Sequence, residues 1–196
     1  AEAGCLAMGG IPVKLQADGL APPLCEPVMQ GIAAELRILE RVMSAHSDEG
    51  AVAAINRGAD AGGPCPTALA EVLARSLKVS RATGGAFDVT VGPLIALWRN
   101  AGKEGRLPTD EERAAALERV GHGAVHLSDG RLSFDRPGIR IDLGGVAKGY
   151  FGDVAVARLR QAGATRCIAD VGMVLFPFPS PPPPPFFLSP LSFSPL

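Results

Sequence analysis

Residues 142–150 read DLGGVAKGY, and they join two segments with different apolar patterns. Before the stretch, apolar and polar residues alternate over 139–143, which predicts a strand. After it, a helical pattern begins at Val146 and ends at Gln161. The glycine pair 144–145 is therefore expected to form a turn from a strand into a helix.

This turn has the chemistry of an anion-binding site. Free backbone N–H groups and the positive end of the helix dipole both point out of a helix start. The two glycines let a ligand approach the main chain without a Cβ in the way. Lys148 adds a positive charge suited to a phosphate, and Asp142 offers a carboxylate to a base, a ribose or a divalent cation. The spacing matches neither the P-loop nor the dinucleotide fingerprint, so an ordinary capped turn with a solvated lysine is the alternative.

Length and composition limit the class of protein. The 196 residues suit one sizeable domain, and the apolar fraction of 47% is enough for a buried core. The 19 basic and 20 acidic residues nearly cancel, unlike the one-signed charge of a nucleic-acid binder. The four cysteines are widely spaced, so a structural zinc site is not expected. Prolines interrupt the apolar C-terminal stretch, so no membrane-spanning helix is predicted there.

The rest of the chain mixes helices with hairpin strands. In the first half of the chain we expect a strand at 11–17, a helix at 28–43 with Pro27 in its first turn, and a helix from Thr67 to Thr83. A third helix is expected from the capping box of Thr109 and Glu112 to Gly121. A hairpin around Asp129 and Gly130 and a last strand at 166–172 follow. This order favours an α+β fold over a doubly wound parallel sheet.

A second stretch, TGGAFDVTVGPL at 83–94, adds another candidate for ligand contact. Gly84 and Gly85 open the backbone, Phe87 offers a flat apolar face, and Asp88 stands beside it. A lone aromatic residue usually belongs to the core, so Phe87 by itself indicates nothing further. The stretch gains meaning only together with DLGGVAKGY and the later DVGM.

Together these segments resemble the ApbE family, the FAD:protein FMN transferases. The family motifs GAFD-x-TVGPL, DL-x-x-x-AKGY and D-[VI]-GG correspond here to residues 85–94, 142–150 and 170–173. Residues 39–56 are similar to a family segment with a serine-rich loop that ends in Leu/Phe-Asn, and the likeness runs from about Met8 to Gly172. The resemblance implies an α+β, ApbE-like (T-fold-like) mixed sheet with packed helices, incomplete at its C-terminus.

The resemblance also implies the chemistry. Family members bind FAD and Mg2+, split the pyrophosphate, and attach FMN through a phosphoester to a Ser or Thr hydroxyl of a target flavoprotein, a subunit of a redox complex. Such phosphoryl transfer depends on positioning and charge neutralisation. The expected location is the periplasm or cell envelope. The start AEAGC, with small residues before Cys5, weakly resembles a lipoprotein cleavage site, so membrane association is expected only through a lipid anchor.

The family's binding positions carry over residue by residue. The expected FAD contacts are Met8, His46, Ala86, Phe87, Asp88, Asp142 and Lys148. Gly145 is expected to give its backbone carbonyl to Mg2+, which suits any side chain. His46 would stack on the ligand, although a plain surface histidine fits equally well. His122 and His126 look structural, and no catalytic residue is assigned.

The likeness ends where Met173 replaces the second glycine of the family's pair. We therefore expect an ApbE-like FAD-binding domain at 1–172 and a proline-rich, low-complexity tail at 173–196. The family segment absent here carries HHI-DP-x-TG and completes the metal site, so a truncation or frameshift would leave this chain unable to transfer FMN. Two rivals stay open: a catalytically inactive flavin-binding module, and an unrelated structural domain whose motifs are only turns.

Overall fold

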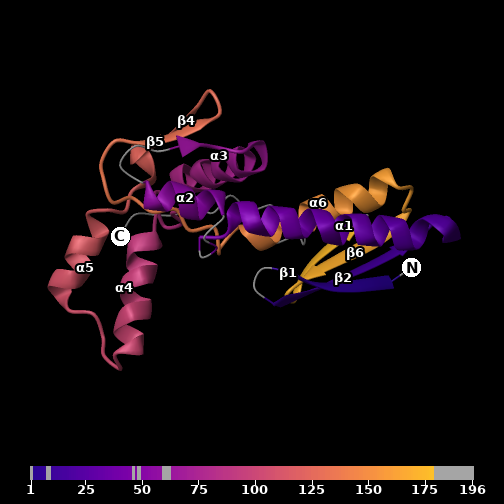
Figure 1. The fold of residues 1–196 in the computed structure, drawn as a ribbon, viewed down its shortest axis with the longest axis horizontal. Helices are drawn as coiled ribbons and strands as arrows, with labels where there is room; N and C mark the ends of the chain where they lie inside the picture. Colours follow the sequence, from indigo (N-terminus) through magenta and orange to yellow (C-terminus); the bar gives the residue numbers. More distant parts are fainter. Residues whose placement is uncertain (1, 8–9, 46, 48–49, 59–62, 179–196) are drawn as a thin grey trace, which may run out of the picture.

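The computed structural model describes residues 2–7, 10–45, 47, 50–58 and 63–178. In chain order its elements are β1 (Glu2–Ala7), β2 (Ile11–Asp18), α1 (Pro22–Met43), α2 (Ala51–Arg57), β3 (Gly63–Pro64), α3 (Thr67–Ala82), α4 (Gly92–Lys103), α5 (Asp110–Leu117), the 3-10 turn η1 (His122–Ala124), β4 (Val125–Ser128), β5 (Arg131–Phe134), α6 (Ala147–Gln161), β6 (Arg166–Val171) and β7 (Val174–Phe178). Figure 1 shows an elongated molecule with a sheet lobe at one end and a mainly helical lobe at the other. The α+β class that the sequence predicts is confirmed.

The larger sheet has the strand order β1-β2-β6-β7, and all neighbouring strands are antiparallel. Helices α1 and α6 lie over one of its faces (Figure 1). In β2 the side chains of Val13, Leu15 and Ala17 are buried, while those between them are exposed, as the alternation of a strand requires. The helices contribute Leu36 and Phe151, both fully buried. This shared core holds the first turns of α6 beside the end of α1.

The second lobe packs α2 and α3 beside a small sheet of order β3-β5-β4. Helix α3 buries the predicted apolar face of Leu69, Val72, Leu73 and Leu77. The β4–β5 hairpin turns at Asp129 (φ 50°) and Gly130 (φ 69°), the left-handed pair of a type I′ turn. Thr109 and Glu112 form the predicted capping box at the start of α5. These locally encoded elements are confirmed.

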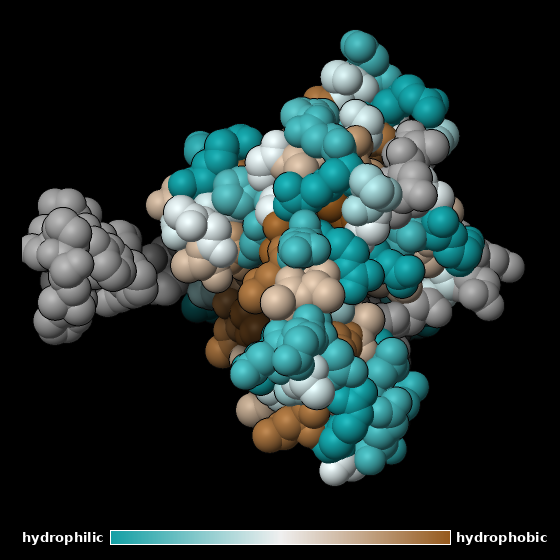
Figure 2. Space-filling model, turned by 90° about the vertical axis from the view of Figure 1, so that its left-hand side faces the viewer, coloured by the Kyte–Doolittle hydropathy of each residue, from teal (hydrophilic) through white to brown (hydrophobic). Residues whose placement is uncertain are grey.

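Helices α4 and α5 pack against each other at the edge of this lobe (Figure 1). The sequence patterns above do not predict α4, although Pro93 in its first turn is a start signal. Within α4 only Pro93 and Ala101 are buried, and the Trp98 side chain is exposed. Figure 2 shows apolar surface gathered in a hollow at this end of the molecule. The described residues therefore leave much of the apolar side of α4 uncovered.

Two predicted elements need correction. Helix α1 begins at Pro22, so Pro27 lies inside the helix and not in its first turn. The start lies earlier because proline is well suited to the first helical position, where its missing N–H has no intrahelical partner to lose. Residues 139–143 alternate in burial as predicted, but they form one isolated β-bridge, between Arg140 and Val91, and no strand.

The strand expected at 166–172 is followed by a further one, β7, which pairs with β6. Gly172 (φ 59°) and Met173 (φ 70°) form the two-residue turn between the two strands. Residues 174–178, which the sequence assigns to the proline-rich tail, therefore belong to the sheet. The ordered structure continues beyond the domain boundary expected at 172.

At the other end of the sheet, β1 is also an element that the sequence patterns do not predict. It includes Cys5, which pairs with Val13 of β2. Cleavage directly before Cys5 would remove half of this strand. No helix among the described residues is both long and apolar enough to cross a bilayer.

Candidate functional site

Backbone hydrogen bonds hold the two central motifs side by side. The Asp142 N–H donates to the carbonyl of Val89 at 2.8 Å, and the Gly92 N–H donates to the carbonyl of Arg140 at 3.3 Å. A Cβ at residue 92 would stand 2.7 Å from that carbonyl oxygen, so only glycine allows this approach. The segments GAFDVTVGPL and DLGGVAKGY therefore meet although they are far apart in the chain.

Asn56, at the end of α2, clamps the same segment from another direction. Its Nδ2 donates to the Ile141 carbonyl at 2.9 Å, and its Oδ1 accepts from the Ile141 N–H at 2.8 Å. This reciprocal pair satisfies backbone groups that no strand ladder would satisfy here. Sequence reasoning noted Asn56 as the end of a family-like segment, but it did not assign the residue this contact.

The turn of residues 142–145 is shaped by Asp142 and Phe87. Asp142 Oδ1 accepts a hydrogen bond from the Gly144 N–H at 2.8 Å, which closes the turn before α6. On the other side, a Cβ at Gly145 would stand 3.3 Å from Cε2 of Phe87. The edge of the Phe87 ring therefore lies against the bare main chain of the turn.

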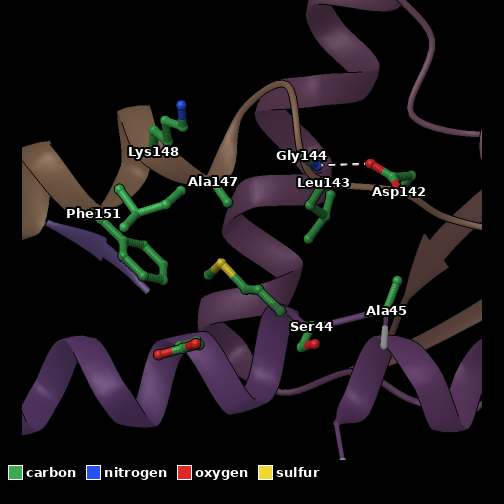
Figure 3. A pocket seen from close by; sticks show the side chains of 11 residues that line it. Ser44, Ala45, Asp142, Leu143, Gly144, Ala147, Lys148 and Phe151 are labelled. Carbon is green, nitrogen blue, oxygen red and sulfur yellow. Dashed lines mark hydrogen bonds between the residues drawn. The ribbon is translucent and has the colours of Figure 1, made fainter. Parts of the chain in front are cut away.

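A cavity of about 350 Å³ opens beside this turn (Figure 3). It is lined by Ile11, Glu40, Met43, Ser44, Ala45, Asp142, Leu143, Gly144, Ala147, Lys148 and Phe151. Its walls come from the end of α1, the turn and the first two turns of α6. Met43, Leu143 and Phe151 are buried and make it apolar, while Glu40, Ser44, Asp142 and Lys148 add polar groups. An apolar cavity with a few polar groups is typical of a small-molecule site.

Lys148 brings the third motif to this cavity. Its side chain is half-buried, and none of the described residues gives its Nζ a hydrogen bond or an ion pair. A Cβ at Gly172, in the turn of DVGM, would stand 3.7 Å from Lys148 Nζ and 2.6 Å from Cγ2 of Ile11. The ammonium group is therefore available to an anionic ligand at a point where the DLGGVAKGY and DVGM motifs meet.

Asp88 is held differently. Its Oδ1 accepts from the N–H and the hydroxyl of Thr90 at 2.8 and 2.6 Å. Its Oδ2 accepts from the backbone N–H of His122 at 2.8 Å and lies 3.0 Å from Nδ1 of that ring. Burial works to raise the pKa of Asp88, but the hydrogen bonds from Thr90 and His122 outweigh it and hold the pKa below its ordinary value. A carboxylate has about four acceptor positions, so this one has none free for a nucleotide.

The remaining predicted site residues are less closely placed. Ala86 is exposed at the turn that precedes Asp88. Gly145 is also exposed, with its carbonyl in the turn described above. Met8 and His46 lie outside the described residues. The structure thus places Phe87 against Gly145, puts Asp142 and Lys148 on one cavity, and directs the Asp88 carboxylate to Thr90 and His122.

The described residues do not by themselves fit a magnesium site. Mg2+ requires about six oxygen ligands in octahedral geometry. Over the described ranges, no group of three or more His, Cys, Asp or Glu side chains is arranged to hold a metal ion. The Gly145 carbonyl, even with the neighbouring Asp142 carboxylate, would leave most of that shell unfilled.

Known proteins share sequence with most of this chain. The model of the ApbE family matches residues 10–176. Among curated relatives, the FAD:protein FMN transferase of Klebsiella pneumoniae (strain 342) is 29% identical over 169 residues, which are 83% of this chain and 48% of that protein. The enzyme of the same name from Haemophilus influenzae is 30% identical over 169 residues, 82% of this chain and 49% of that protein. The chain thus spans about half the length of these relatives.

Solved structures give the same result for the fold. The apo form of the Pseudomonas stutzeri flavinyl transferase ApbE superposes with a TM-score of 0.79 at 26% identity, over 90% of this chain and 57% of that one. A mutant of the flavin transferase ApbE from Vibrio cholerae superposes with a TM-score of 0.77 at 26% identity, over 89% of this chain and 61% of that one.

Proposed function

The chain belongs to the ApbE family, and from this membership we propose that it serves in the transfer of FMN from FAD to a protein. In the proposed reaction, a Ser or Thr hydroxyl of a target flavoprotein attacks the phosphorus of the FMN half. The new phosphoester bond forms as the pyrophosphate bond breaks, and AMP and the hydroxyl proton leave. The observation that carries the proposal is that Asp142 and Lys148 of one motif line a cavity, while the other two motifs contact the same segment, Phe87 at Gly145 and Gly172 at Lys148.

The chain's own groups support the binding of a dinucleotide with a charged centre and an apolar ring. Lys148 offers a positive charge without a partner among the described residues, beside the start of α6. Asp142 lines the cavity, and its Oδ1 accepts a hydrogen bond from the Gly144 N–H. The residues that we propose as FAD contacts are Met8, His46, Ala86, Phe87, Asp88, Asp142 and Lys148. Of these, Asp88 would act through its backbone, because its carboxylate is saturated.

Magnesium belongs to the proposal at the level of the family only. Gly145 would give one carbonyl ligand, and the further ligands expected from the resemblance belong to a motif without a counterpart at 173–196. The proposed binding of FAD is therefore tested with and without the ion. A binding affinity that is unchanged by a chelator fits a site whose nucleotide contacts come from the chain itself.

A second candidate is a flavin-binding module without transferase activity. The specific observation in its favour is that the described residues hold no metal-ligating cluster next to the cavity. In this case the same residues would bind FAD, but the pyrophosphate would stay intact. The two candidates therefore share the binding step and differ only in the transfer.

The partner and the location are also proposals. We propose that the acceptor is a flavoprotein subunit of a redox complex in the periplasm or cell envelope, and that any membrane association uses a lipid anchor. Radioactive fatty-acid labelling and cell fractionation of the full-length protein test the anchor and the location together. Protein found only in the cytoplasmic fraction would contradict both.

One experiment separates the candidates. The 196-residue chain is titrated into FAD, and quenching of flavin fluorescence reports binding. The chain is then incubated with FAD, Mg2+ and an acceptor protein of a family enzyme, and covalent flavin is detected by in-gel fluorescence after denaturation. A matched sample carries a C-terminal half restored from a relative. Transfer by either sample supports the transferase, binding without transfer in both supports the module, and no binding in either excludes both.

A further inference from the structure

A buried polar cluster, made of Asp88, Thr90 and His122, ties the GAFD turn to η1. Thr90 is fully buried, and its hydroxyl both donates to Asp88 Oδ1 at 2.6 Å and accepts from the Gly121 N–H at 2.7 Å. Every acceptor position of the Asp88 carboxylate is used. A fully satisfied buried network of this kind rigidifies the segments that it joins. The turn that carries Phe87 is therefore anchored to η1 by this cluster.

His122 contributes to this cluster twice, and its two contributions differ in kind. Its backbone N–H donates to Asp88 Oδ2 at 2.8 Å, a contact that any residue would make. Its ring places Nδ1 3.0 Å from the same oxygen, and its Cε1 lies 3.6 Å from the position that a Cβ of Gly85 would occupy. An ionised carboxylate only accepts hydrogen bonds, so Nδ1 must carry the hydrogen. The ring thus lies over the GAFD turn and donates into it.

The anchored carboxylate adjoins the residue that contacts the turn beside the cavity. Phe87, one position before Asp88, presents its ring edge to Gly145. One position after Asp88, the Val89 carbonyl accepts from the Asp142 N–H at 2.8 Å. Asp88 therefore connects the polar cluster to the two neighbouring residues, Phe87 and Val89, that contact the DLGG turn. A looser carboxylate would let the Phe87 ring move away from Gly145.

We propose that His122 is a positioning residue for the flavin nucleotide: the N–H of its ring fixes Asp88 and thereby holds Phe87 against Gly145 at the edge of the binding site. The inference rests on the proposed function. It assigns no contact between His122 and the ligand. We expect the ring to matter for affinity more than for folding, because the backbone N–H of His122 donates to the same carboxylate oxygen and is kept when the ring is removed.

The test compares three variants of the whole chain. His122→Ala removes the ring donor, whereas His122→Asn keeps a side-chain N–H at a similar reach. His126→Ala is the matched control, since it removes the other histidine that pairs with an aspartate, Asp135, in an exposed position on the hairpin. Flavin quenching gives the dissociation constant for FAD, and thermal unfolding gives Tm. We expect His122→Ala to weaken FAD binding about tenfold, as for the loss of a hydrogen bond to a charged group, and the other two to bind within about twofold of the wild type.

A readout without FAD separates this inference from the proposed function. The amide signal of Gly145 in an NMR spectrum reports the nearby Phe87 ring, and we expect it to shift in His122→Ala but not in His122→Asn or His126→Ala. If the wild type does not bind FAD, the proposed function fails and the Gly145 signal alone decides the positioning role. An unmoved signal in His122→Ala, or equally weak FAD binding by the Ala and Asn variants, overturns the inference. Should His122→Ala fail to fold, NMR of the wild-type ring decides: an Nδ1 without hydrogen overturns the inference.

Discussion

The Phe87 ring lies edge-on to the main chain of Gly145, and a Cβ at residue 145 would stand 3.3 Å from Cε2 of the ring. This distance is tighter than most contacts that a real Cβ makes, so a side chain at residue 145 would have to displace the ring. The hydrogen bond from the Asp142 N–H to the Val89 carbonyl fixes the separation of the two segments. The fit of Phe87 against Gly145 is thus built into the junction of the two motifs.

Gly145→Ala tests this fit. The added methyl group would push the Phe87 ring while leaving the residue 145 carbonyl in place. We expect FAD binding to weaken about tenfold, because overpacking a contact costs roughly 1–3 kcal/mol, and Tm to fall only slightly, because Gly145 is exposed and Phe87 is only half-buried. Titration of FAD fluorescence measures the affinity. The control is Gly149→Ala in α6, where nothing lies within 4 Å of the new Cβ; equal affinities of the two variants would contradict the prediction.

Lys148→Ala tests the phosphate contact. Removing the ammonium group should weaken FAD binding, and the loss should be greatest at low ionic strength, where charge pairing is least screened. Lys148→Arg should keep most of the affinity because the charge stays. Titrations at two salt concentrations give the comparison, with Lys78→Ala, an exposed lysine of α3, as the control. If Lys148→Ala binds FAD as tightly as the wild type at low salt, Lys148 makes no phosphate contact and is an ordinary solvated lysine.

Asp88→Asn tests the saturated carboxylate. The substitution replaces one carboxylate oxygen by an NH2 group, which then faces the N–H and O–H donors of Thr90 and His122. We therefore expect a loss of about 1–3 kcal/mol in the free energy of unfolding at neutral pH. Because the pKa of Asp88 is lowered in the folded protein, its stabilising contribution is present above the ordinary value of 3.8 and is lost as the pH falls through the lower pKa. The difference between variant and wild type should therefore shrink in acid.

Urea unfolding at a series of pH values measures this difference. Asp135→Asn is the matched control, because Asp135 pairs with His126 in the open and should contribute little. A stability of Asp88→Asn equal to that of the wild type at neutral pH would show that the four hydrogen bonds contribute nothing net.

Met173→Gly tests the turn between β6 and β7. Met173 adopts φ 70°, a left-handed conformation that costs a residue with a side chain about 1–2 kcal/mol, and glycine avoids this cost. The Met173 side chain is 91% exposed, so little burial is lost with it. We expect a gain of about 1 kcal/mol in the free energy of unfolding, measured with urea. Met173→Ala keeps the left-handed strain, so its free energy of unfolding should not increase. An equal increase in both variants would show that the backbone strain of the turn is not the cause.

Local chemistry made much of the fold predictable. The type I′ turn at Asp129 and Gly130 and the capping box of Thr109 and Glu112 each depend on residues within one turn of the chain. The apolar face of α3 follows from periodicity alone. The start of α1 was missed because Pro27 fits a first turn as well as Pro22 does, and only packing distinguishes the two. The motif residues could be named from the sequence, but their mutual contacts could not.

The sequence by itself determined the family, the α+β class and two charged residues of the cavity, Asp142 and Lys148, because motif spacing, helix starts and turn residues are local properties of the chain. Only the tertiary structure decided which groups meet. Asn56 pairs with Ile141, His122 donates to Asp88, and Gly172 approaches Lys148. Each of these contacts joins residues that are distant in the chain, so each depends on a long-range packing of side chains that no local pattern encodes.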